Sequence, residues 1–396
     1  MRRLALFALL LAGCGTDFAP QSQVAGFRVL GMRADPPDLH PGDTANLASL
    51  VVDPGQPGLP ITMLYLACDP DPTGLGSNPC SQYQTVADAQ GLFVADGGLP
   101  PGAHFLGINT ASYTAPAGLF DAQPANAVTR QAGVLAVVLG VALGTDVSSL
   151  PQGASAAQLF QLVVSKQIPS QLVIKRLRVS EEPNLNHNPE LGLVATDTDE
   201  IRPEHPLLAL PGTSVPLFAR ASSGAHESYV AIGLDGTPDP RTETAAFSWF
   251  TSAGSLAQDR TTDNDTTVQQ FLNIPDGVGD GIEHVIPGDR HFTLWVVVRD
   301  GRGGEDWQAL PGIVCDPSAP AATLSAAQLV NGEIFASGDH LDAIIDATLD
   351  GQPILGSYQS SLDAFVGRLP AGAQGTHTLE VRDLGCHRSQ ATLTVP

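Results

Sequence analysis

Residues 292–307 read FTLWVVVRDGRGGEDW, and this stretch decides the fold class of the chain. Its first part, FTLWVVVR, is apolar or β-branched up to the closing arginine, which is typical of a buried strand. Asp300–Gly304 (DGRGG) follows as a tight turn, because glycine adopts turn conformations at little steric cost. Glu305–Leu310 then returns, so the stretch predicts an antiparallel pair of strands.

The composition of the whole chain agrees with this prediction. Of the 396 residues, 43% are hydrophobic, and only 15% are charged, which is too few for a disordered polyelectrolyte. The 41 Gly and 32 Pro fit many short strands joined by turns. At a usual size of ~100–200 residues per domain, the length predicts about two to four domains.

The N-terminus has the three parts of an export signal. Arg2 and Arg3 form a positive region, Leu4–Leu11 is a short apolar segment, and Leu11-Ala12-Gly13-Cys14 follows at once. The apolar segment is too short to span a bilayer, which needs about 20 residues. We therefore expect residues 1–13 to be a signal peptide.

Residues 11–14 resemble the lipobox of bacterial lipoproteins. The resemblance implies lipidation of Cys14 with a diacylglyceryl group, cleavage before it, and a further fatty acid such as palmitate on the new amino group. In enteric lipoproteins, an Asp directly after the lipidated cysteine retains the protein at the inner membrane. Gly15 stands at that position here, so the resemblance also implies the outer membrane or the cell surface. A periplasm-facing orientation is left open. An ordinary signal peptide with a chance cysteine is the alternative.

Loss of Arg2 and Arg3 with the signal takes the formal charge from −22 to −24. So acidic a protein repels nucleic acid and anionic membrane surfaces. We expect no nucleic-acid partner. We also expect the protein to associate with the membrane through its lipid anchor alone.

The mature chain divides into a tether and three expected domains. Residues 14–23 are the tether and residues 24–180 the first domain, an Ig-like domain with insertions. After a linker at Ser180–Pro189, residues 190–314 and 315–396 form the second and third domains. The strands expected in the first domain are 27–34, 44–52, 61–68, Val163-Val164 and 172–179.

Two segments of the first domain stand apart. Val134–Leu143 (VLAVVLGVAL) is apolar throughout, and we expect a strand buried on both faces. The role of residues 81–160 is left open, apart from a short helix expected at Ala156–Leu162. In the second domain we expect strands at Ser214–Ala221, Ala245–Phe250 and Phe292–Arg299.

The strand order at the start of the first domain resembles that of bacterial immunoglobulin-like (Ig-like) domains. FSWFTSAGS, residues 247–255, together with residues 292–307, resembles Ig-like and PKD-like modules, which implies that Trp249 and Trp295 are core residues facing each other. HTLEV, ATLTV and the Asp350-Gly351 turn of the third domain resemble an IPT/TIG module. The fold class implied is all-β: tandem Ig-like β-sandwich domains.

Four cysteines remain after Cys14, and their spacing is wrong for a zinc site. An even number in an exported protein predicts disulfides. In an Ig-like sandwich the start of the first strand lies close to the loop before the last strand, so we expect Cys315 to pair with Cys386. Cys68 and Cys80 flank a Pro/Gly turn and are expected to pair locally.

The residues that could hold a metal or perform chemistry form no complete motif. Asp263, Asp265, Asp276 and Asp280 lie in expected loops and are candidate calcium ligands, but none completes an EF-hand loop, and Asp is also a common turn residue. The ten histidines are scattered, and there is no G-x-S-x-G elbow or P-loop. We expect no cofactor, no metal and no enzyme activity.

The function expected from these features is that of a lipid-anchored cell-envelope protein, a non-catalytic Ig-like array that is structural, adhesive or ligand-binding. Its ligand would be a surface protein or a glycan. The alternative is a carbohydrate-binding or enzyme-accessory lipoprotein, which would expose aromatic side chains. The aromatic residues to inspect for this are Tyr65, Tyr83, Tyr113, Tyr229 and Trp307.

Overall fold

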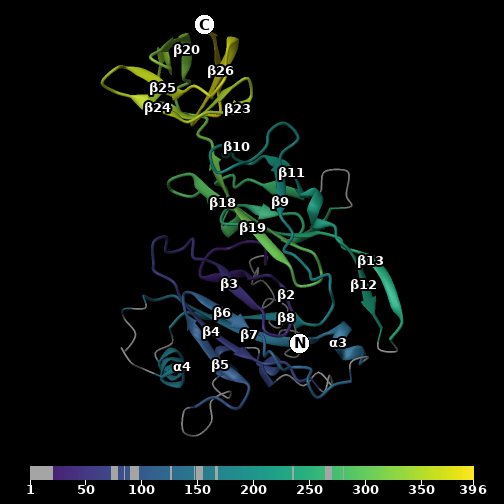
Figure 1. The fold of residues 1–396 in the computed structure, drawn as a ribbon. Coiled ribbons are helices and arrows are strands. Elements are labelled where there is room, and N and C mark those ends of the chain that lie inside the picture. The colour runs from purple at the N-terminus through teal and green to yellow at the C-terminus, as the bar shows by residue number, and fades with distance from the viewer. Residues whose placement is uncertain are drawn as a thin grey trace, which may run out of the picture.

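The computed structural model describes residues 21–72, 79–83, 85–89, 98–124, 127–146, 148, 155–165, 168–233, 236–263, 270–279 and 281–396. Its strands form three successive β-sandwiches, from the purple and blue end of the chain to the yellow C-terminal end (Figure 1). The prediction of an all-β fold built from tandem sandwiches is confirmed. Cys14 and the export signal lie outside the described residues. No helix in the described part of the chain is long and apolar enough to cross a membrane.

The first sandwich packs a three-stranded sheet on a five-stranded one. The smaller sheet has the order β1 (Arg28–Asp35), β3 (Thr44–Val52), β6 (Ala111–Thr114). The larger has the order β2 (Asp38–Leu39), β8 (Ser170–Val179), β7 (Val134–Leu143), β4 (Thr62–Cys68), β5 (Ala103–Ile108). Short helices accompany them: η1 (Pro79–Gln82), α2 (Val86–Ala89), α3 (Val128–Ala132) and α4 (Ala156–Ser165).

Strand β7 lies in the middle of the larger sheet and is buried on both faces, as predicted, except at Leu135. Side chains alternate along a strand, so Val138 faces the core between the two sheets while Val137 and Leu139 face the layer that contains α4. The expected helix is present as α4. The strand expected at Val163-Val164 is wrong, because these residues continue α4 and Val163 packs beside Leu159 and Phe160.

The second sandwich has one sheet of five strands and one of four. The first has the order β10 (Leu207–Ala209), β19 (Glu305–Val314), β18 (His291–Arg299), β14 (Ala246–Thr251), β16 (Arg260–Thr262). The second has the order β15 (Ser255–Leu256), β17 (Gln270–Asn273), β11 (Ser214–Ala221), β9 (Leu191–Ala195). Two 3₁₀ turns, η4 (Ser223–Ala225) and η5 (Ile282–His284), lie in its loops.

The two tryptophans of this sandwich do not face each other, which corrects the expectation. Strands β14 and β18 are neighbours in one sheet, where Trp249 pairs with Val296 and Phe250 pairs with Trp295. Two residues that pair across neighbouring strands point to the same face of the sheet, and the next pair along the strands points to the opposite face. Trp249 therefore fills the core of the second sandwich, whereas Trp295 belongs to a separate cluster outside that core.

A two-stranded hairpin, which we call the arm, comes from the second sandwich. It consists of β12 (Ser228–Ile232) and β13 (Pro238–Thr242), which pair only with each other, and it stands off to one side (Figure 1). The arm contacts α3 of the first sandwich. An isolated hairpin is only marginally stable, so this contact helps to hold the arm in place.

The third sandwich has two four-stranded sheets. One has the order β20 (Thr323–Val330), β21 (Glu333–Asp339), β25 (Ala364–Arg368), β24 (Gly356–Gln359). The other has the order β23 (Gln352–Pro353), β22 (Ile344–Leu349), β26 (Gly375–Asp383), β27 (Arg388–Val395), and η6 (Leu341–Ala343) precedes β22. Phe365, Leu379 and Leu393 are fully buried between the sheets.

Candidate functional site

An apolar cluster fills the contact between the first and second sandwiches, which we call the first junction. Val24, Leu30 and Val52 pack there against Trp295 of β18. Beside this cluster, Arg33 stacks on Trp307 at 5.3 Å and pairs with Asp306 at 2.6 Å. The outward face of the second sandwich is thus covered by the first.

The segment that enters the first sandwich also belongs to this junction. The Val24 N–H donates to the Thr251 carbonyl (2.8 Å), and the Thr251 N–H donates to the Ser22 carbonyl (2.9 Å). Ser22 and Gln23, which the sequence places in the tether, are buried against the second sandwich. The chain therefore enters the fold at the first junction, along the edge of β14.

A network of charged side chains lies beside the apolar cluster. The fully buried Asp38 accepts hydrogen bonds from Nε and Nη2 of Arg178 (3.0 and 2.5 Å), and its Oδ2 lies 3.6 Å from Nη2 of Arg302. Arg302 also donates to Glu243 at 2.8 Å. Burial raises the pKa of Glu243, although the hydrogen bond from Arg302 acts in the opposite direction. Arg302 is thus shared between one buried carboxylate of each sandwich, whereas Arg178 pairs with Asp38 inside the first sandwich.

The linker predicted at residues 180–189 is part of the same network. Asn186 is buried, its N–H donates to Asp38 (3.2 Å), and its Nδ2 donates to Asp300 (2.8 Å). Asp300 also accepts the backbone N–H groups of Arg302, Gly303 and Gly304. Asp300 thereby fixes the β18–β19 turn that presents Arg302 to the first sandwich.

A cavity of about 340 Å³ opens next to this network. Its walls come from β8, the linker, the arm and the β18–β19 turn. Arg302 stacks on the ring of Tyr229 at 4.2 Å, and Arg241 of the arm pairs with Asp239 at 2.7 Å. The lining residues are Arg178, Glu182, Asn184, Ser228, Tyr229, Val230, Pro240, Arg241, Thr242 and Arg302.

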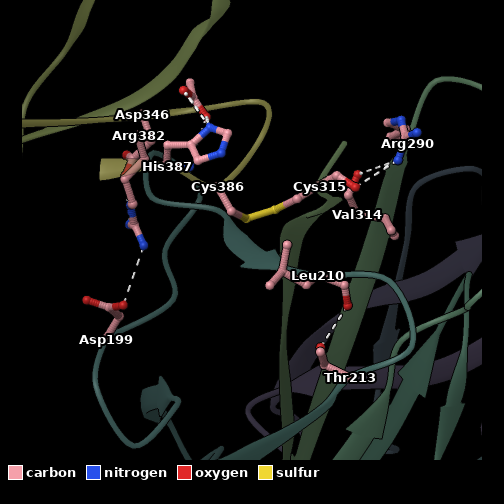
Figure 2. Close-up of a disulfide and its surroundings, with 11 residues drawn as sticks. Asp199, Leu210, Thr213, Arg290, Val314, Cys315, Asp346, Arg382, Cys386 and His387 are labelled. Atoms are coloured by element: carbon pink, nitrogen blue, oxygen red, sulfur yellow. Dashed lines mark hydrogen bonds and ion pairs between the residues drawn. A yellow bond between two sulfur atoms is a disulfide. The ribbon is translucent and has the colours of Figure 1, made fainter. Parts of the chain in front are cut away.

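The four cysteines form the two pairs that the sequence predicted. The Cα atoms of Cys68 and Cys80 are 5.9 Å apart, and those of Cys315 and Cys386 are 5.6 Å apart. The second bridge lies where the second and third sandwiches meet, which we call the second junction (Figure 2). There Arg290 donates to the Cys315 carbonyl at 2.8 Å.

Buried charges also hold the second junction. His205 of the second sandwich lies 3.1 Å from Asp346 of the third, and Arg382 lies 2.6 Å from the same carboxylate and contacts both ring nitrogens of His205. Asp199 lies 3.4 Å from Arg382 (Figure 2). Burial acts to raise the pKa of Asp346, but the hydrogen bond from His205 and the charge of Arg382 hold it below its usual value.

The aspartates considered for calcium are not brought together by the described residues. Asp263 lies 2.8 Å from Nε2 of His226, and Asp276 lies 2.9 Å from Nδ1 of His284. Asp265 and Asp280 lie outside the described residues. Within the described ranges, no group of three His, Cys, Asp or Glu side chains is placed to hold a metal ion.

Most aromatic residues considered for glycan stacking are buried. Tyr65 donates its hydroxyl to Ser49 and Tyr113 donates its hydroxyl to Asp69, and burial raises the pKa of both phenols. Tyr83 is buried as well, and Trp307 is half-buried beneath Arg33. Of the five aromatics, Tyr229 borders the cavity at the first junction.

Of the residues that line this site, the sequence indicated Tyr229 alone, as a candidate glycan contact. Arg178, Tyr229 and Arg302 come from three separate regions of the chain, and no motif links them. The clearest signal available was DGRGG, which predicted the turn but not that its arginine crosses to the first sandwich.

No family model matches the chain, and no curated protein matches it. Solved structures similar to it include the Bacteroides ovatus mixed-linkage glucan utilization locus protein SGBP-B in complex with a mixed-linkage heptasaccharide, at 12% identity over 96% of this chain and 67% of that one, with a TM-score of 0.17. Another is Drosophila OTK, extracellular domains 3–5, at 9% identity over 95% of this chain and 99% of that one, with a TM-score of 0.18. At these TM-scores the likeness carries no argument about ligands.

Proposed function

We propose that this chain is a lipid-anchored cell-envelope protein whose three Ig-like domains, residues 24–180, 190–314 and 315–396, form one stiff, non-catalytic array. One observation carries the proposal: each junction is filled by buried side chains rather than by a free linker. Apolar packing and the shared Arg302 hold the first junction, and a disulfide and the buried contact of His205 with Asp346 hold the second. Such an array keeps its binding surfaces at fixed positions outside the cytoplasm.

The place where the chain enters the fold refines this proposal. Lipid on Cys14 would be joined to Gln21 by seven peptide units, which span at most about 25 Å when fully extended. Because Ser22 and Gln23 are held at the first junction, the anchor would attach near the middle of the array. The first junction would then lie close to the membrane surface.

The most buried histidine–aspartate pair among the described residues serves the second junction rather than a reaction. A general base must have a ring nitrogen free to take a proton from substrate. In His205, Nδ1 faces Asp346 and both ring nitrogens contact Arg382. This pair therefore serves the junction and leaves no nitrogen for a reaction.

Carbohydrate binding is a second candidate function, favoured by the cavity at the first junction. Its volume of about 340 Å³ lies within the usual range of ligand pockets, about 300–1,000 Å³. It combines one aromatic ring, Tyr229, with amide, hydroxyl and charged side chains that could bond sugar hydroxyls. A small ligand or the end of a chain would fit there.

Fractionation of cells tests the anchor. Cys14→Ala should move the protein from the membrane fraction, released only by detergent, to the soluble or unprocessed pool, because two acyl chains suffice for stable anchoring. Gly13→Ala keeps a small residue before the cysteine and should stay in the membrane fraction. If Cys14→Ala behaves like the unaltered chain, the anchor is elsewhere.

A further inference from the structure

We propose that the cavity at the first junction binds an acidic saccharide unit, with its carboxylate held by Arg178 and Arg241. The inference rests on the second candidate function above, carbohydrate binding, and adds the chemical class of the ligand. It does not depend on the lipid anchor.

Arginines are concentrated in the lining of this cavity, although the chain as a whole is acidic. The chain carries 41 Asp and Glu against 19 Lys and Arg. The cavity is lined by Arg178, Arg241 and Arg302, with Glu182 as its one acidic lining residue among those described. Asp38, Glu243 and Asp239 offset much of the arginine charge, so the cavity would hold an anion through directed N–H donors rather than through a strong positive field.

Two of these arginines keep donors for a ligand. Arg178 donates from Nε and Nη2 to Asp38, and within the described part of the chain its Nη1 donates no hydrogen bond. The Arg241 side chain is 57% exposed and pairs with Asp239, which is 55% exposed, and it also forms a hydrogen bond with Tyr229. A pair this exposed is weak, so the guanidinium can turn to a ligand at little cost.

Arg302 has a different role. Its side chain is 10% exposed, it donates to Glu243, and it covers one face of Tyr229. It therefore holds the aromatic wall in place and contributes charge without being free to reorient. Arg178 and Arg241 are left as the forks that can bind a planar carboxylate through paired N–H groups.

The rest of the lining suits a sugar better than a peptide. Asn184, Ser228 and Thr242 offer amide and hydroxyl groups, and Glu182 accepts hydrogen bonds from sugar hydroxyls. Val230 and Pro240, both of the arm, are the aliphatic lining residues. A carboxylate on a hydroxyl-rich ring therefore fits this lining best.

Titration calorimetry on the full chain in a non-ionic detergent tests the assignment. The probes are trigalacturonate, a hyaluronan tetrasaccharide and 3′-sialyllactose, beside maltotriose and fully methyl-esterified trigalacturonate as neutral counterparts. At least one acidic probe should bind, and Arg241→Ala should weaken it at least about tenfold, since hydrogen bonds to charged groups are worth this much. Among the described residues, the side-chain partners of Arg241 are Asp239 and Tyr229 of the arm itself, so the variant should melt like the unaltered chain.

Arg220→Ala is the matched control, because Arg220 is an exposed arginine on β11 outside the cavity lining, and it should leave binding unchanged. Binding of neutral probes alone would keep the carbohydrate-binding candidate and overturn the acidic assignment. Binding of no saccharide at all would overturn both. Equal binding to the Arg241→Ala variant, or capture of a peptide C-terminal carboxylate in place of the saccharides, would overturn the site as proposed.

Discussion

Asp38 is a buried carboxylate of the first sandwich that an arginine of the second sandwich approaches. Asp38→Asn keeps its shape but leaves Arg178 and part of the charge of Arg302 without a counterion in a buried place. Removing one partner of a buried pair costs about 3–5 kcal/mol, so the midpoint of denaturant unfolding should fall clearly. Asp239→Asn, at the exposed pair on the arm, is the matched control and should change the midpoint little.

Asp346 makes the stability of the second junction depend on pH in the acid range. Its pKa in the folded protein lies below the usual 3.8, so the unfolded chain takes up the proton first as the pH falls. The stabilisation is present above the unfolded pKa of about 3.9 and is lost as the pH falls through the folded pKa. Urea unfolding should therefore show this contribution unchanged from neutral pH down to about pH 4, and decreasing below that.

Asp346→Asn should remove that acid-dependent decrease. If the unaltered chain instead loses this stabilisation between neutral pH and pH 5, the carboxylate does not hold the junction as described.

At the residue scale, the sequence could identify partners but not faces. The cysteine pairs followed from spacing and from the order of strands in a sandwich. The sequences of β14 and β18 could not tell which tryptophan points into the core. Trp249 on β14 and Trp295 on β18 are equally apolar, and only the register between the two strands places them on opposite faces. From the sequence, Tyr65 and Tyr113 were candidate ligand contacts. In the structure, both lie in the core of the first sandwich.

The two disulfides differ in the length of chain they close, 71 residues for Cys315–Cys386 and 12 for Cys68–Cys80. In the chain-entropy model the longer loop contributes about 4 kcal/mol and the shorter about 3 kcal/mol. Replacing Cys315 and Cys386 by Ala should therefore lower the unfolding free energy of the third sandwich more than the corresponding change lowers that of the first. Calorimetric melting of both double variants measures this, and the reverse order would contradict it.

Helix α4 covers the outer face of the larger sheet of the first sandwich through Leu159, Phe160 and Val163. Phe160→Ala should cost about 3–5 kcal/mol, because a fully buried ring leaves a cavity. Gln161→Ala, one residue along on the exposed side, should leave the unfolding midpoint nearly unchanged. Equal effects of the two substitutions would show that α4 is not packed on the sheet.

At the element scale, long apolar runs and several amphipathic strands such as β11 were predictable, whereas strands with a weak pattern were not. The continuous apolar pattern of β7 correctly identified a strand that is buried on both faces. Strand β20 (TLSAAQLV) is mostly exposed and has few large apolar residues, so its pattern is weak. Strand β13 (PDPRT) has the composition of a turn, and it becomes a strand because β12 pairs with it.

At the scale of the whole molecule, the sequence predicted separate domains but not how they join. The first junction unites Val24, Asp38, Trp295 and Arg302, which lie up to about 280 residues apart, and no local pattern marks any of them as an interface residue. Domains of one chain move relative to each other by default unless their interface is extensive and well packed. The stiffness of the array therefore depends on the filling of both junctions.

Loosening the first junction should change the array without unfolding it. Trp295→Ala removes the largest side chain of the apolar cluster, which packs outside the core of the second sandwich. Hydrogen exchange should rise at Val24 and Thr251, whose backbone groups pair across this junction, while the strands of the third sandwich keep their protection. Unchanged exchange at those two residues would show that the cluster does not close the junction.

Pulsed electron–electron double resonance measures the central claim, stiffness, most directly. Spin labels at Gln161→Cys in the first sandwich, Gly224→Cys in the second and Gln328→Cys in the third occupy exposed positions and provide one distance across each junction. We predict a single narrow distance distribution for each pair of adjacent sandwiches, and broadening of the first alone in Trp295→Ala. Broad distributions in the otherwise unaltered chain would contradict the stiff array, since they would show that the sandwiches move independently.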